Sequence, residues 1–474
     1  MASLNRTILS GEILSKTGRR YFYDALTNKF FGSNDPAKKT PLIQDQISPI
    51  QRIKLPFSSN ELKQELKTRL SHLILNVTEQ CNLRCDYCSY SGHQQFRRRH
   101  SPAQMSLDVA RGALDWFFEH SREAPEITIS FYGGEPLLNQ EIIKDTVAYA
   151  KSLFHHKKIR FMITTNGLFL DTNFTSWLSV NPEVFINVTL NGPAEFHDRF
   201  RHTADGQGSQ FHIMQNLNEI KHNDPAMFAR RIGITINYLT AVELPVIQEW
   251  WFAEPIFQAK LPLALRRIIL RFADDELKNR LQRFMPDQSA VQAAFNRLEA
   301  EYITHLKRRT PERNLWGLLW DSPLAHIHFR SRLPLEPIHL FTGSCVPFAR
   351  RTFVDVNGNL RLCEKSDGKV IFGQVKEGID FHKLAELVAG FGELLNQHCR
   401  FCYAIRYCTL CLNDVLDVQG ISNRLQSSKC RDVKIGFQRE LALYCSIMEE
   451  GEELLEHLYP PGNRFPLVLD YSSV

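Results

Sequence analysis

The fold class is decided by residues 73–88, which read LILNVTEQCNLRCDYC and place Cys81, Cys85 and Cys88 directly after an apolar run. The apolar, β-rich beginning of this stretch predicts a buried strand that ends where the cysteines begin. Three thiols in a C-x3-C-x2-C run on a loop can ligate three irons of a cubane cluster and leave the fourth iron open. A structural zinc ion would need a fourth protein ligand, and His93 is the only nearby histidine. The stretch therefore favours an iron–sulfur site over zinc or three incidental thiols.

Strand-like and helix-like segments alternate after this stretch. Apolar, β-rich runs predict strands at residues 73–77, 127–131, 159–164, 185–190, 232–239 and 266–271. Amphipathic patterns predict helices at residues 105–120, 141–154, 211–221, 242–251 and 275–307. This alternation is typical of an α/β protein with a parallel sheet that closes at least partly into a barrel. We expect this unit to span residues 71–335.

The cysteine run, together with a second motif, resembles the radical S-adenosylmethionine (SAM) superfamily. The run has the spacing of that superfamily, including an aromatic residue, Tyr87, before the last cysteine, and the motif GGEP follows the second expected strand. Over residues 71–270 the resemblance implies a partial (β/α)6, TIM-like barrel that binds a [4Fe–4S] cluster and SAM at the C-terminal ends of its strands. It places Tyr87 among the cofactor-binding residues. It also implies that Gly133, Gly134 and Glu135 of GGEP hold the amino group of SAM, because a carboxylate pairs with an ammonium.

Two later positions also resemble the superfamily. Thr189 lies in the fourth expected strand, where the resemblance implies contact with the ribose of the cofactor, and Arg201 follows, where contact with its carboxylate is implied. Relatives usually carry Ser or Thr and then Asp in this turn, and Asn191 departs from that pattern. A turn-forming role for Thr189 and a surface charge for Arg201 stay open as alternatives.

Seven cysteines beyond residue 340 form a second pattern: Cys345, Cys363, Cys399, Cys402, Cys408, Cys411 and Cys430. Their spacing resembles the SPASM extension of radical SAM enzymes, which carries two auxiliary [4Fe–4S] clusters, so three clusters are expected in all. The resemblance implies one auxiliary cluster on Cys399, Cys402, Cys408 and Cys430. It implies another, one ligand short, on Cys345, Cys363 and Cys411.

The missing ligand leaves alternatives open. In fully ligated relatives a cysteine stands six residues before the first of this pattern, and here that position is His339. An imidazole can bind iron; otherwise the iron stays open to water, substrate or a precursor thiolate. Residues 399–411 also resemble a zinc ribbon, which would make this region a binding module. Cys445 falls inside an amphipathic run, and we expect it to be a core residue.

The resemblance implies a reaction as well as a fold. Reductive cleavage of SAM yields a 5′-deoxyadenosyl radical, which abstracts hydrogen from an unactivated C–H bond. Enzymes with the SPASM extension act on peptides or proteins, so we expect an oxidoreductase-type maturase that forms a thioether or carbon–carbon crosslink in a ribosomally synthesised peptide. One alternative is formylglycine-type oxidation of a protein Cys or Ser, with Glu364 where sulfatase-maturing relatives carry an Asp proposed as a base. The other is a non-enzymatic, zinc-binding interaction protein.

Composition excludes several classes of protein. The 474 residues include 57 Lys and Arg against 52 Asp and Glu, a net charge of +5, which is too mild for a nucleic-acid-binding surface. No stretch has the roughly 20 uninterrupted apolar residues of a membrane helix, and the N-terminus lacks a secretory apolar core, so we expect a cytoplasmic protein without a membrane partner. The implied partners are the precursor peptide or protein and an electron donor such as flavodoxin or ferredoxin.

The N-terminal segment, residues 1–70, is polar and irregular. Its pattern predicts a hairpin of residues 12–14 and 21–23 and a short helix at 60–70. Because peptide maturases often begin with a small recognition domain, this segment is a candidate for binding the leader of a precursor peptide by strand addition.

The C-terminal segments are assigned by their patterns. Residues 336–432 are assigned to the SPASM extension, and the Asn357-Gly358 pair within them predicts a hairpin with a type I′ turn. Residues 433–474 are assigned to a helix and a tail. In the barrel, the basic run RRRH at 97–100 is interpreted as a solvated loop or a charge near the cofactor, with attraction of an acidic leader as the alternative.

Overall fold

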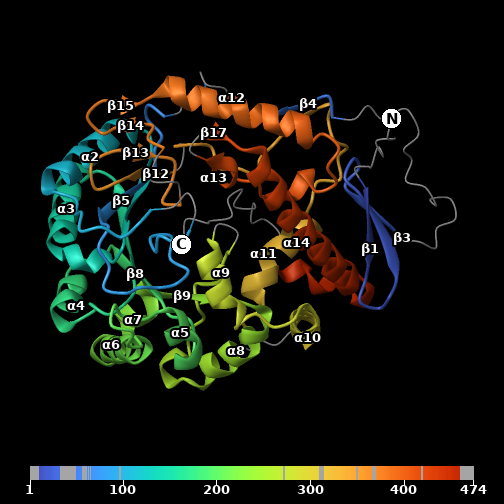
Figure 1. Ribbon diagram of the computed structural model, residues 1–474, viewed down its shortest axis with the longest axis horizontal. Helices are drawn as coiled ribbons and strands as arrows, with labels where there is room; N and C mark the ends of the chain where they lie inside the picture. The colour runs from blue at the N-terminus through green and yellow to red at the C-terminus, as the bar shows by residue number, and fades with distance from the viewer. Residues whose placement is uncertain are drawn as a thin grey trace.

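One eight-stranded sheet forms the centre of the computed structural model (Figure 1). The structure describes residues 10–32, 50–55, 61, 63–64, 66–94, 98–270, 273–308, 314–348, 351–365, 370–417 and 420–458. In spatial order the strands are β10 (Ala264–Arg267), β9 (Ile232–Tyr238), β8 (Val184–Thr189), β7 (Lys158–Thr165), β6 (Glu126–Gly133), β5 (His72–Thr78), β12 (Arg351–Val354) and β13 (Leu360–Arg361). Strands β5 to β10 run parallel and neighbour one another in chain order. The predicted parallel sheet of a partial (β/α)6 barrel is confirmed.

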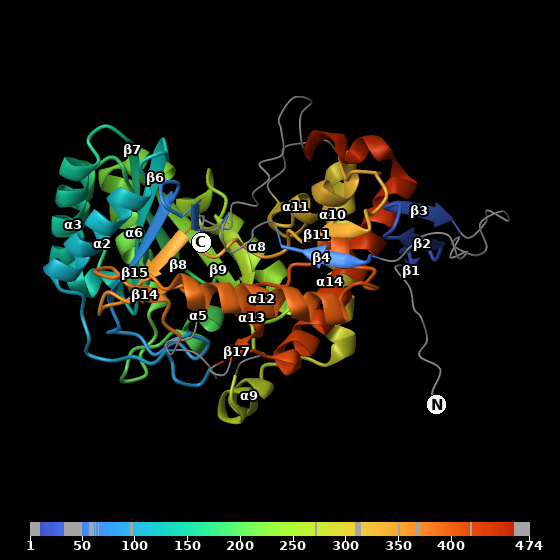
Figure 2. The ribbon, with the colours of Figure 1, turned by 90° about the horizontal axis from the view of Figure 1, so that it is seen from above.

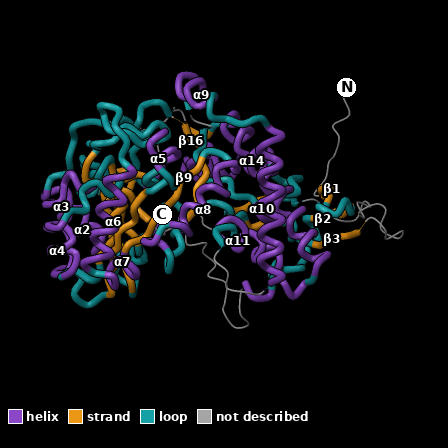
Figure 3. The backbone as a smooth tube through the Cα atoms, turned by 90° about the horizontal axis from the view of Figure 1, so that it is seen from below, coloured by secondary structure: helices purple, strands orange, loops and turns teal. Residues whose placement is uncertain are grey.

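Helices alternate with these strands, which lie inside the helical layer (Figure 3). They are α2 (Leu107–His120), α3 (Gln140–Leu153), α4 (Thr172–Ser179), α5 (Ala194–Phe200), α6 (Gln210–Asn223), α7 (Pro225–Arg231) and α8 (Leu244–Ala253). The side chains of Ser106, Asp171 and Asp224 cap α2, α4 and α7 by accepting a backbone N–H of the first turn. These caps satisfy donors that the helix itself leaves unpaired, and so determine where each helix begins.

The two faces of the sheet differ in polarity. The face under the helices carries fully buried apolar side chains such as Leu75 and Phe131. Side chains at alternate positions point the other way, and on that face polar groups pair between strands, as where Thr235 Oγ1 donates to Asn187 Oδ1 at 3.0 Å. We call it the inner face. A polar inner face is suited to binding a ligand, whereas a closed barrel core is filled by branched apolar residues.

A strand from the cysteine-rich part extends the same sheet. Strand β12 pairs in parallel with β5, Arg351 opposite His72 and Val354 opposite Leu75, and β13 adds an antiparallel partner. Strand β5 therefore has neighbours on both edges and is buried along its whole length. The segment that resembles a SPASM extension thus shares a sheet with the barrel.

The hairpin between β12 and β13 is present, but the prediction of a type I′ turn is wrong. Asp355 Oδ1 accepts from the backbone N–H groups of Asn357 and Asn359, each at 3.0 Å. Of the pair Asn357-Gly358, Gly358 alone has a positive φ, at 82°. Because a type I′ turn needs positive φ at both central residues, the carboxylate of Asp355 stabilises a wider loop instead.

The single helix predicted at 275–307 is also wrong, since it is divided into α9 (Asp275–Gln282) and α10 (Gln288–Arg308). Pro286 lacks a backbone N–H and interrupts the helical ladder. Asp287 then starts the second helix by accepting a backbone N–H of its first turn at 2.7 Å. The break lets α9 and α10 point in different directions (Figure 1).

The rest of the chain packs beside the barrel (Figure 2). Its helices are α11 (Gly317–His328), α12 (Phe381–His398), α13 (Leu412–Val415) and α14 (Asn423–Glu450), and its strands are β11 (Ile338–Leu340), β14 (Gly373–Gln374), β15 (Gly378–Ile379), β16 (Leu416–Asp417) and β17 (Gly420–Ile421). The 3-10 helices are η2 (Pro136–Asn139), η3 (Ala241–Glu243), η4 (Pro255–Phe257), η5 (Ile405–Tyr407), η6 (Glu452–Leu454) and η7 (Glu456–Leu458). Among the described residues, no helix combines the length and the apolar character needed to cross a bilayer.

The N-terminal region forms an antiparallel sheet of β1 (Ser10–Leu14), β2 (Arg20–Asp24) and β3 (Lys29–Gly32). The predicted hairpin is confirmed, and sequence analysis missed its third strand. The sheet is fastened to α14, since Tyr21 Oη donates to Glu449 Oε1 at 2.8 Å. Further along, β4 (Arg52–Lys54) pairs in parallel with β11. The helix predicted at 60–70 lies partly outside the described residues, and 66–68 form a turn.

Candidate functional site

The first three cysteines lie on the loop that leaves β5 at the C-terminal edge of the sheet. Backbone hydrogen bonds fix this loop to the chain around the end of α5, from Arg84 N to His202 O at 2.7 Å and from Asp86 N to Phe200 O at 3.0 Å. Because these bonds use only main-chain groups, they hold the loop without engaging a thiol.

Cys85 of this loop is buried, and Cys81 and Cys88 are half-buried and receive main-chain donors. Cys81 Sγ accepts from Leu83 N at 3.4 Å, and Cys88 Sγ accepts from Tyr90 N at 3.3 Å. Burial raises the pKa of the Cys81 and Cys85 thiols and raises that of Cys88 to about 12. The thiols therefore stay protonated at neutral pH until a metal displaces the proton. Three thiols close together in sequence, two of them with N–H donors to sulfur, fit an iron–sulfur cluster.

Helix α9 closes over the same loop, a contact that sequence analysis missed. Arg280 Nη2 lies 3.0 Å from Asp86 Oδ1, and Asp274 Oδ2 lies 3.1 Å from His93 Nδ1. Leu277 anchors the helix in a small apolar cluster apart from the main core. His93, the histidine nearest to the cysteines in sequence, is thus held by a carboxylate.

The two glycines of GGEP allow the end of β6 to touch this loop. A Cβ on Gly133 would lie 2.1 Å from Thr78 O, and a Cβ on Gly134 would lie 2.1 Å from Gln80 O. Gly134 N donates to Thr78 O at 2.8 Å, and Glu135 N donates to Gln80 O at 2.7 Å. Both glycines are therefore required by the contact between two strand ends, independently of any cofactor.

The carboxylate of Glu135 is buried and already accepts three hydrogen bonds. Its donors are Leu137 N at 2.9 Å, Thr165 Oγ1 at 2.7 Å and Asn166 N at 2.7 Å. Burial raises the pKa of Glu135, and the three donors oppose that rise. The carboxylate fastens the GGEP turn to the end of β7, a role that sequence analysis missed. Its contact with the amino group of a cofactor stays a prediction.

A buried arginine with an unused donor lies beside the cysteine loop. Arg201 Nη1 donates to Tyr87 Oη at 3.3 Å, and Asn191 Nδ2 donates to the same oxygen at 2.9 Å. Arg201 Nη2 is buried without a hydrogen-bond partner. An orphaned guanidinium N–H fits a carboxylate ligand. Burial excludes the surface-charge alternative for Arg201, and the structure places Tyr87, Asn191 and Arg201 together.

Thr189 ends β8 on the inner face, opposite Thr235 of β9. The register of the sheet puts Asn237 and Arg266 on the same face of β9 and β10, and Tyr132 on that face of β6. The C-terminal end of the inner face is therefore polar. It lies beside the cysteine loop, where barrel enzymes hold their ligands.

The seven C-terminal cysteines fall into two groups. One contains Cys399, Cys402, Cys408 and Cys430. Burial raises the pKa of Cys399, as do Cys430, Cys408 and Cys402, and burial raises the pKa of Cys408, to which Cys402 and Cys430 contribute. The other contains Cys345, Cys363 and Cys411. Burial and then Glu364 and Cys411 raise the pKa of Cys363, and burial and then Asp414 and Cys345 raise that of Cys411. This membership is the one that the SPASM resemblance implied, and the ligation of iron by these thiols stays a prediction. Cys445 lies apart from both groups, buried in α14.

His339, the candidate fourth ligand of the three-cysteine group, lies in β11 opposite Ile53. Burial and then the guanidinium of Arg406 lower its pKa to about 4. Ligation of iron by His339 stays a prediction.

A zinc ribbon and a cluster place different demands on these thiols. A tetrahedral zinc ion with Zn–S bonds of about 2.3 Å requires sulfurs within roughly 4 Å of one another. A cubane binds each thiolate through a different iron and spaces the sulfurs more widely. Among the residues that the structure describes, no three His, Cys, Asp or Glu side chains converge on a single-metal site. The choice between clusters and zinc stays a prediction.

Glu364 follows Cys363 and is buried beside β12. Its Oε1 lies 3.2 Å from Arg351 Nη1, and its Oε2 is buried without a partner. Burial opposes ionisation, but Arg351 and then Lys365 lower the pKa of Glu364 below its ordinary value. A buried carboxylate with one unoccupied oxygen is able to accept a proton from a bound substrate.

Burial divides the basic run that follows the cysteine loop. Arg98 is 7% exposed, whereas Arg99 is exposed and Arg97 lies outside the described residues. The guanidinium of Arg98 packs between the rings of Tyr90 and Phe353. Interpretation of the run as a solvated loop is therefore wrong at Arg98.

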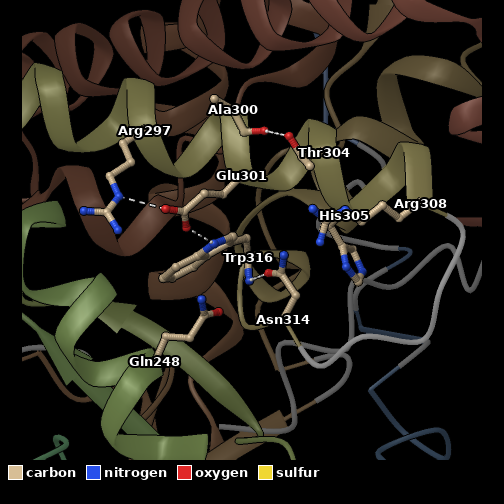
Figure 4. A pocket seen from close by; sticks show the side chains of 9 residues that line it. All are labelled: Gln248, Arg297, Ala300, Glu301, Thr304, His305, Arg308, Asn314 and Trp316. Atoms are coloured by element: carbon tan, nitrogen blue, oxygen red, sulfur yellow. Dashed lines mark hydrogen bonds and ion pairs between the residues drawn. The ribbon is translucent and has the colours of Figure 1, made fainter.

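A surface pocket of about 440 Å³ lies elsewhere, between α8 and α10 (Figure 4). Glu301 is its central group, because Oε1 accepts from Arg297 Nε at 2.8 Å and Oε2 accepts from Trp316 Nε1 at 3.0 Å. The side chains that line it are Gln248, Arg297, Ala300, Glu301, Thr304, His305, Arg308, Asn314 and Trp316. None of them belongs to the predicted site residues, so the pocket is separate from the cysteine loop.

Comparison with known proteins agrees with this geometry. Residues 75–224 match the model of the Radical SAM superfamily. The chain is 28% identical over 142 residues to a serine-type anaerobic sulfatase-maturating enzyme of Bacteroides thetaiotaomicron. This alignment covers 30% of this chain and 34% of that protein. It is 28% identical over 151 residues to a cysteine-type anaerobic sulfatase-maturating enzyme of Clostridium novyi. That alignment covers 31% of this chain and 39% of that protein.

A solved structure shares the fold. The structure of native anSMEcpe with bound AdoMet and Cp18Cys peptide matches with a TM-score of 0.55 and 17% identity, covering 79% of this chain and 99% of that one. At this identity the likeness shows the fold alone. The matches to curated relatives span between about a third and two fifths of the length of the two maturating enzymes.

The glycine contact generates a prediction about stability. Gly134→Ala should destabilise the chain by about 2–3 kcal/mol or more, because its Cβ meets a backbone oxygen that cannot move aside. Urea unfolding of the metal-free chain measures this change. The matched control is Gly392→Ala in α12, where a Cβ meets nothing within 4 Å and helix propensity favours alanine. Equal unfolding free energies for the two variants would contradict the close contact.

Proposed function

We propose that this chain, whose residues 75–224 match the model of the Radical SAM superfamily, removes a hydrogen atom from a peptide or protein substrate and thereby matures it. The observation that carries the proposal is the placement of three thiols, one buried and two half-buried, and the orphaned Nη2 of Arg201 at one edge of a parallel sheet. The thiols suit a cluster, and the guanidinium suits the carboxylate of SAM.

The residues of the site have separate tasks in this proposal. When bound, the cluster and SAM supply a 5′-deoxyadenosyl radical that takes hydrogen from the substrate. Cys81, Cys85 and Cys88 hold the cluster, and Arg201 binds the carboxylate of SAM. Tyr87 orients Arg201 through the 3.3 Å hydrogen bond to Nη1.

The remaining contacts of SAM are proposed from the resemblance and the position of each residue. The main chain of Gly133 and Gly134 and the side chain of Glu135 surround its amino group, and Thr189 on the inner face reaches its ribose. All four lie at the C-terminal edge of the sheet beside the cysteine loop. Buried side chains around them exclude water from the reacting atoms.

The proposed outcome is a thioether or carbon–carbon crosslink in a ribosomally made peptide. Support comes from the three-cysteine group, which lacks a fourth cysteine among the described residues and has Cys345 exposed. An iron that the protein leaves open at such a place can take a cysteine thiolate of the substrate. Cys399, Cys402, Cys408 and Cys430 hold the second auxiliary cluster in this proposal.

Formylglycine-type oxidation is the second candidate, and Glu364 is the observation that favours it. Its unpartnered Oε2 is a base beside the barrel, and two similar proteins carry the name sulfatase-maturating enzyme. A sulfatase-type peptide with Cys at the target position discriminates between the outcomes by mass. Loss of sulfur and gain of a carbonyl oxygen indicates formylglycine, whereas loss of two hydrogens with the sulfur retained indicates a crosslink.

Partners of the reaction are proposed as well. A flavodoxin or ferredoxin would supply electrons to the clusters. The sheet of β1, β2 and β3 is a candidate for holding the leader of a precursor, because β1 and β3 are its edge strands.

Removal of the first cluster is the direct test. The variant with Cys81→Ala, Cys85→Ala and Cys88→Ala should form no 5′-deoxyadenosine from SAM under anaerobic reduction, while the absorbance of the auxiliary clusters persists. Chromatography of the nucleoside products measures this. Undiminished cleavage of SAM by the triple variant would overturn the proposal.

Metal content tests the number of clusters. After anaerobic reconstitution we expect about twelve irons and about twelve sulfides per chain, with negligible zinc. Cys402→Ala should lower the iron content by about four and impair folding, because a buried cluster contributes to stability. About four irons with one or two zincs in the wild-type chain would restrict the proposal to the barrel.

Arg201→Lys tests the carboxylate contact. Lysine keeps the charge but not the planar fork, so we expect the affinity for SAM to fall about 10- to 100-fold. Anaerobic equilibrium binding measures it. Arg199→Lys is the matched control, since Arg199 is engaged by Glu243 at 3.1 Å. Equal affinities of the two variants would remove Arg201 from the SAM site.

A further inference from the structure

Arg98 is a buried cation whose charge has no carboxylate partner among the described residues. Its guanidinium carbon lies 4.8 Å from the centroid of the Tyr90 ring and 4.3 Å from that of the Phe353 ring. Nη2 donates to the main-chain oxygen of Glu364, and Nη1 is buried without a partner. The carboxylate of Glu364 is directed instead to Arg351. A positive charge buried in this way is costly unless a negative group is close.

Arg98 lies between the two cysteine regions that are proposed to hold clusters. On one side it contacts Tyr90, whose N–H donates to Cys88 Sγ at 3.3 Å in the loop of the first cluster. On the other side it bonds to Glu364, the neighbour in sequence of Cys363 in the three-cysteine group. Arg98 therefore joins both cysteine regions across the seam between β5 and β12.

The charges of the two proposed clusters would be complementary to that of the guanidinium. A [4Fe–4S] cluster held by three thiolates carries a net negative charge, and one-electron reduction makes it more negative. A fixed cation in a site of low dielectric stabilises the reduced form more than the oxidised form and so raises the reduction potential. The rings of Tyr90 and Phe353 exclude water, so this interaction is not screened as it would be at the surface.

We propose that Arg98 is a positioning residue that balances the charge of the first cluster and of the cluster on the three-cysteine group, and raises the reduction potentials of both. This inference rests on the proposed assignment of those two clusters. It assigns no contact with SAM or substrate to Arg98. The role depends on the positive charge more than on the shape of the side chain.

Reduction potentials of the full, anaerobically reconstituted chain test the inference. Dithionite titration followed by electron paramagnetic resonance should give lower midpoint potentials for both clusters in Arg98→Gln than in the wild-type chain. Arg98→Lys keeps the charge and should restore both potentials most of the way. A purely structural role would not distinguish Lys from Gln in this manner, since neither reproduces the fork of arginine.

A control variant and a second variant background test whether the change in potential is specific to Arg98. Arg99→Gln removes the same charge from the next residue, which is exposed and screened by water, and should leave both potentials unchanged. Repeating Arg98→Gln in the Cys81→Ala, Cys85→Ala and Cys88→Ala background isolates the auxiliary signals. If Arg98→Gln fails to retain iron, Arg98→Met, which keeps an unbranched apolar stem between the two rings, takes its place.

The outcomes separate this inference from the proposed function. Wild-type potentials in an iron-replete Arg98→Gln or Arg98→Met chain would overturn the role of Arg98 and leave the enzyme assignment intact. A shift of equal size in Arg99→Gln would overturn it too, because the effect would then not depend on burial. A wild-type chain that takes up no iron on Cys81, Cys85 and Cys88 would instead overturn the proposed function.

Discussion

The contact between the end of β6 and the end of β5 is the constraint on which the candidate site depends. Two glycines let the backbones meet, and the N–H groups of the GGEP turn then bind the carbonyl oxygens that precede Cys81. Glu135 ties the same turn to β7 through three hydrogen bonds. Three consecutive strand ends are thus joined into one edge, and the cysteine loop takes its position from that edge.

Two aromatic residues of the cysteine loop contact the buried arginines around it. Tyr87 and Tyr90 stand on either side of Cys88 in sequence, and each contacts a buried arginine, Arg201 in one case and Arg98 in the other. Each guanidinium retains a buried N–H without a partner. Because unpaired buried cations are unfavourable, the proposed cluster and the carboxylate of SAM would offset the cost of burying these charges.

Local signals predicted the fold well because strands and cysteine spacing are properties of short segments. The six parallel strands follow β-rich runs, and the errors arose where one side chain altered a turn or helix, as at Asp355 and Pro286. Only the site residues that belong to motifs of fixed spacing were predicted from the sequence. The burial of Arg98 between two rings, and the ion pair of Arg280 with Asp86, depend on segments distant in sequence. No sequence pattern around Arg98 or Arg280 predicts the residues that these side chains contact.

The parallel pairing of β12 with β5 has a consequence for how the molecule is made. The two strands lie more than half the chain apart in sequence, and β5 carries the first cysteines at its end. During synthesis one edge of β5 stays without a partner until residues beyond 350 have emerged, since a ribosome releases the N-terminal strands first. An apolar strand with an open edge associates readily with other chains. Completion of the cysteine-rich part therefore closes this edge, and the unfinished barrel is the stage at which a cell must protect this chain from aggregation.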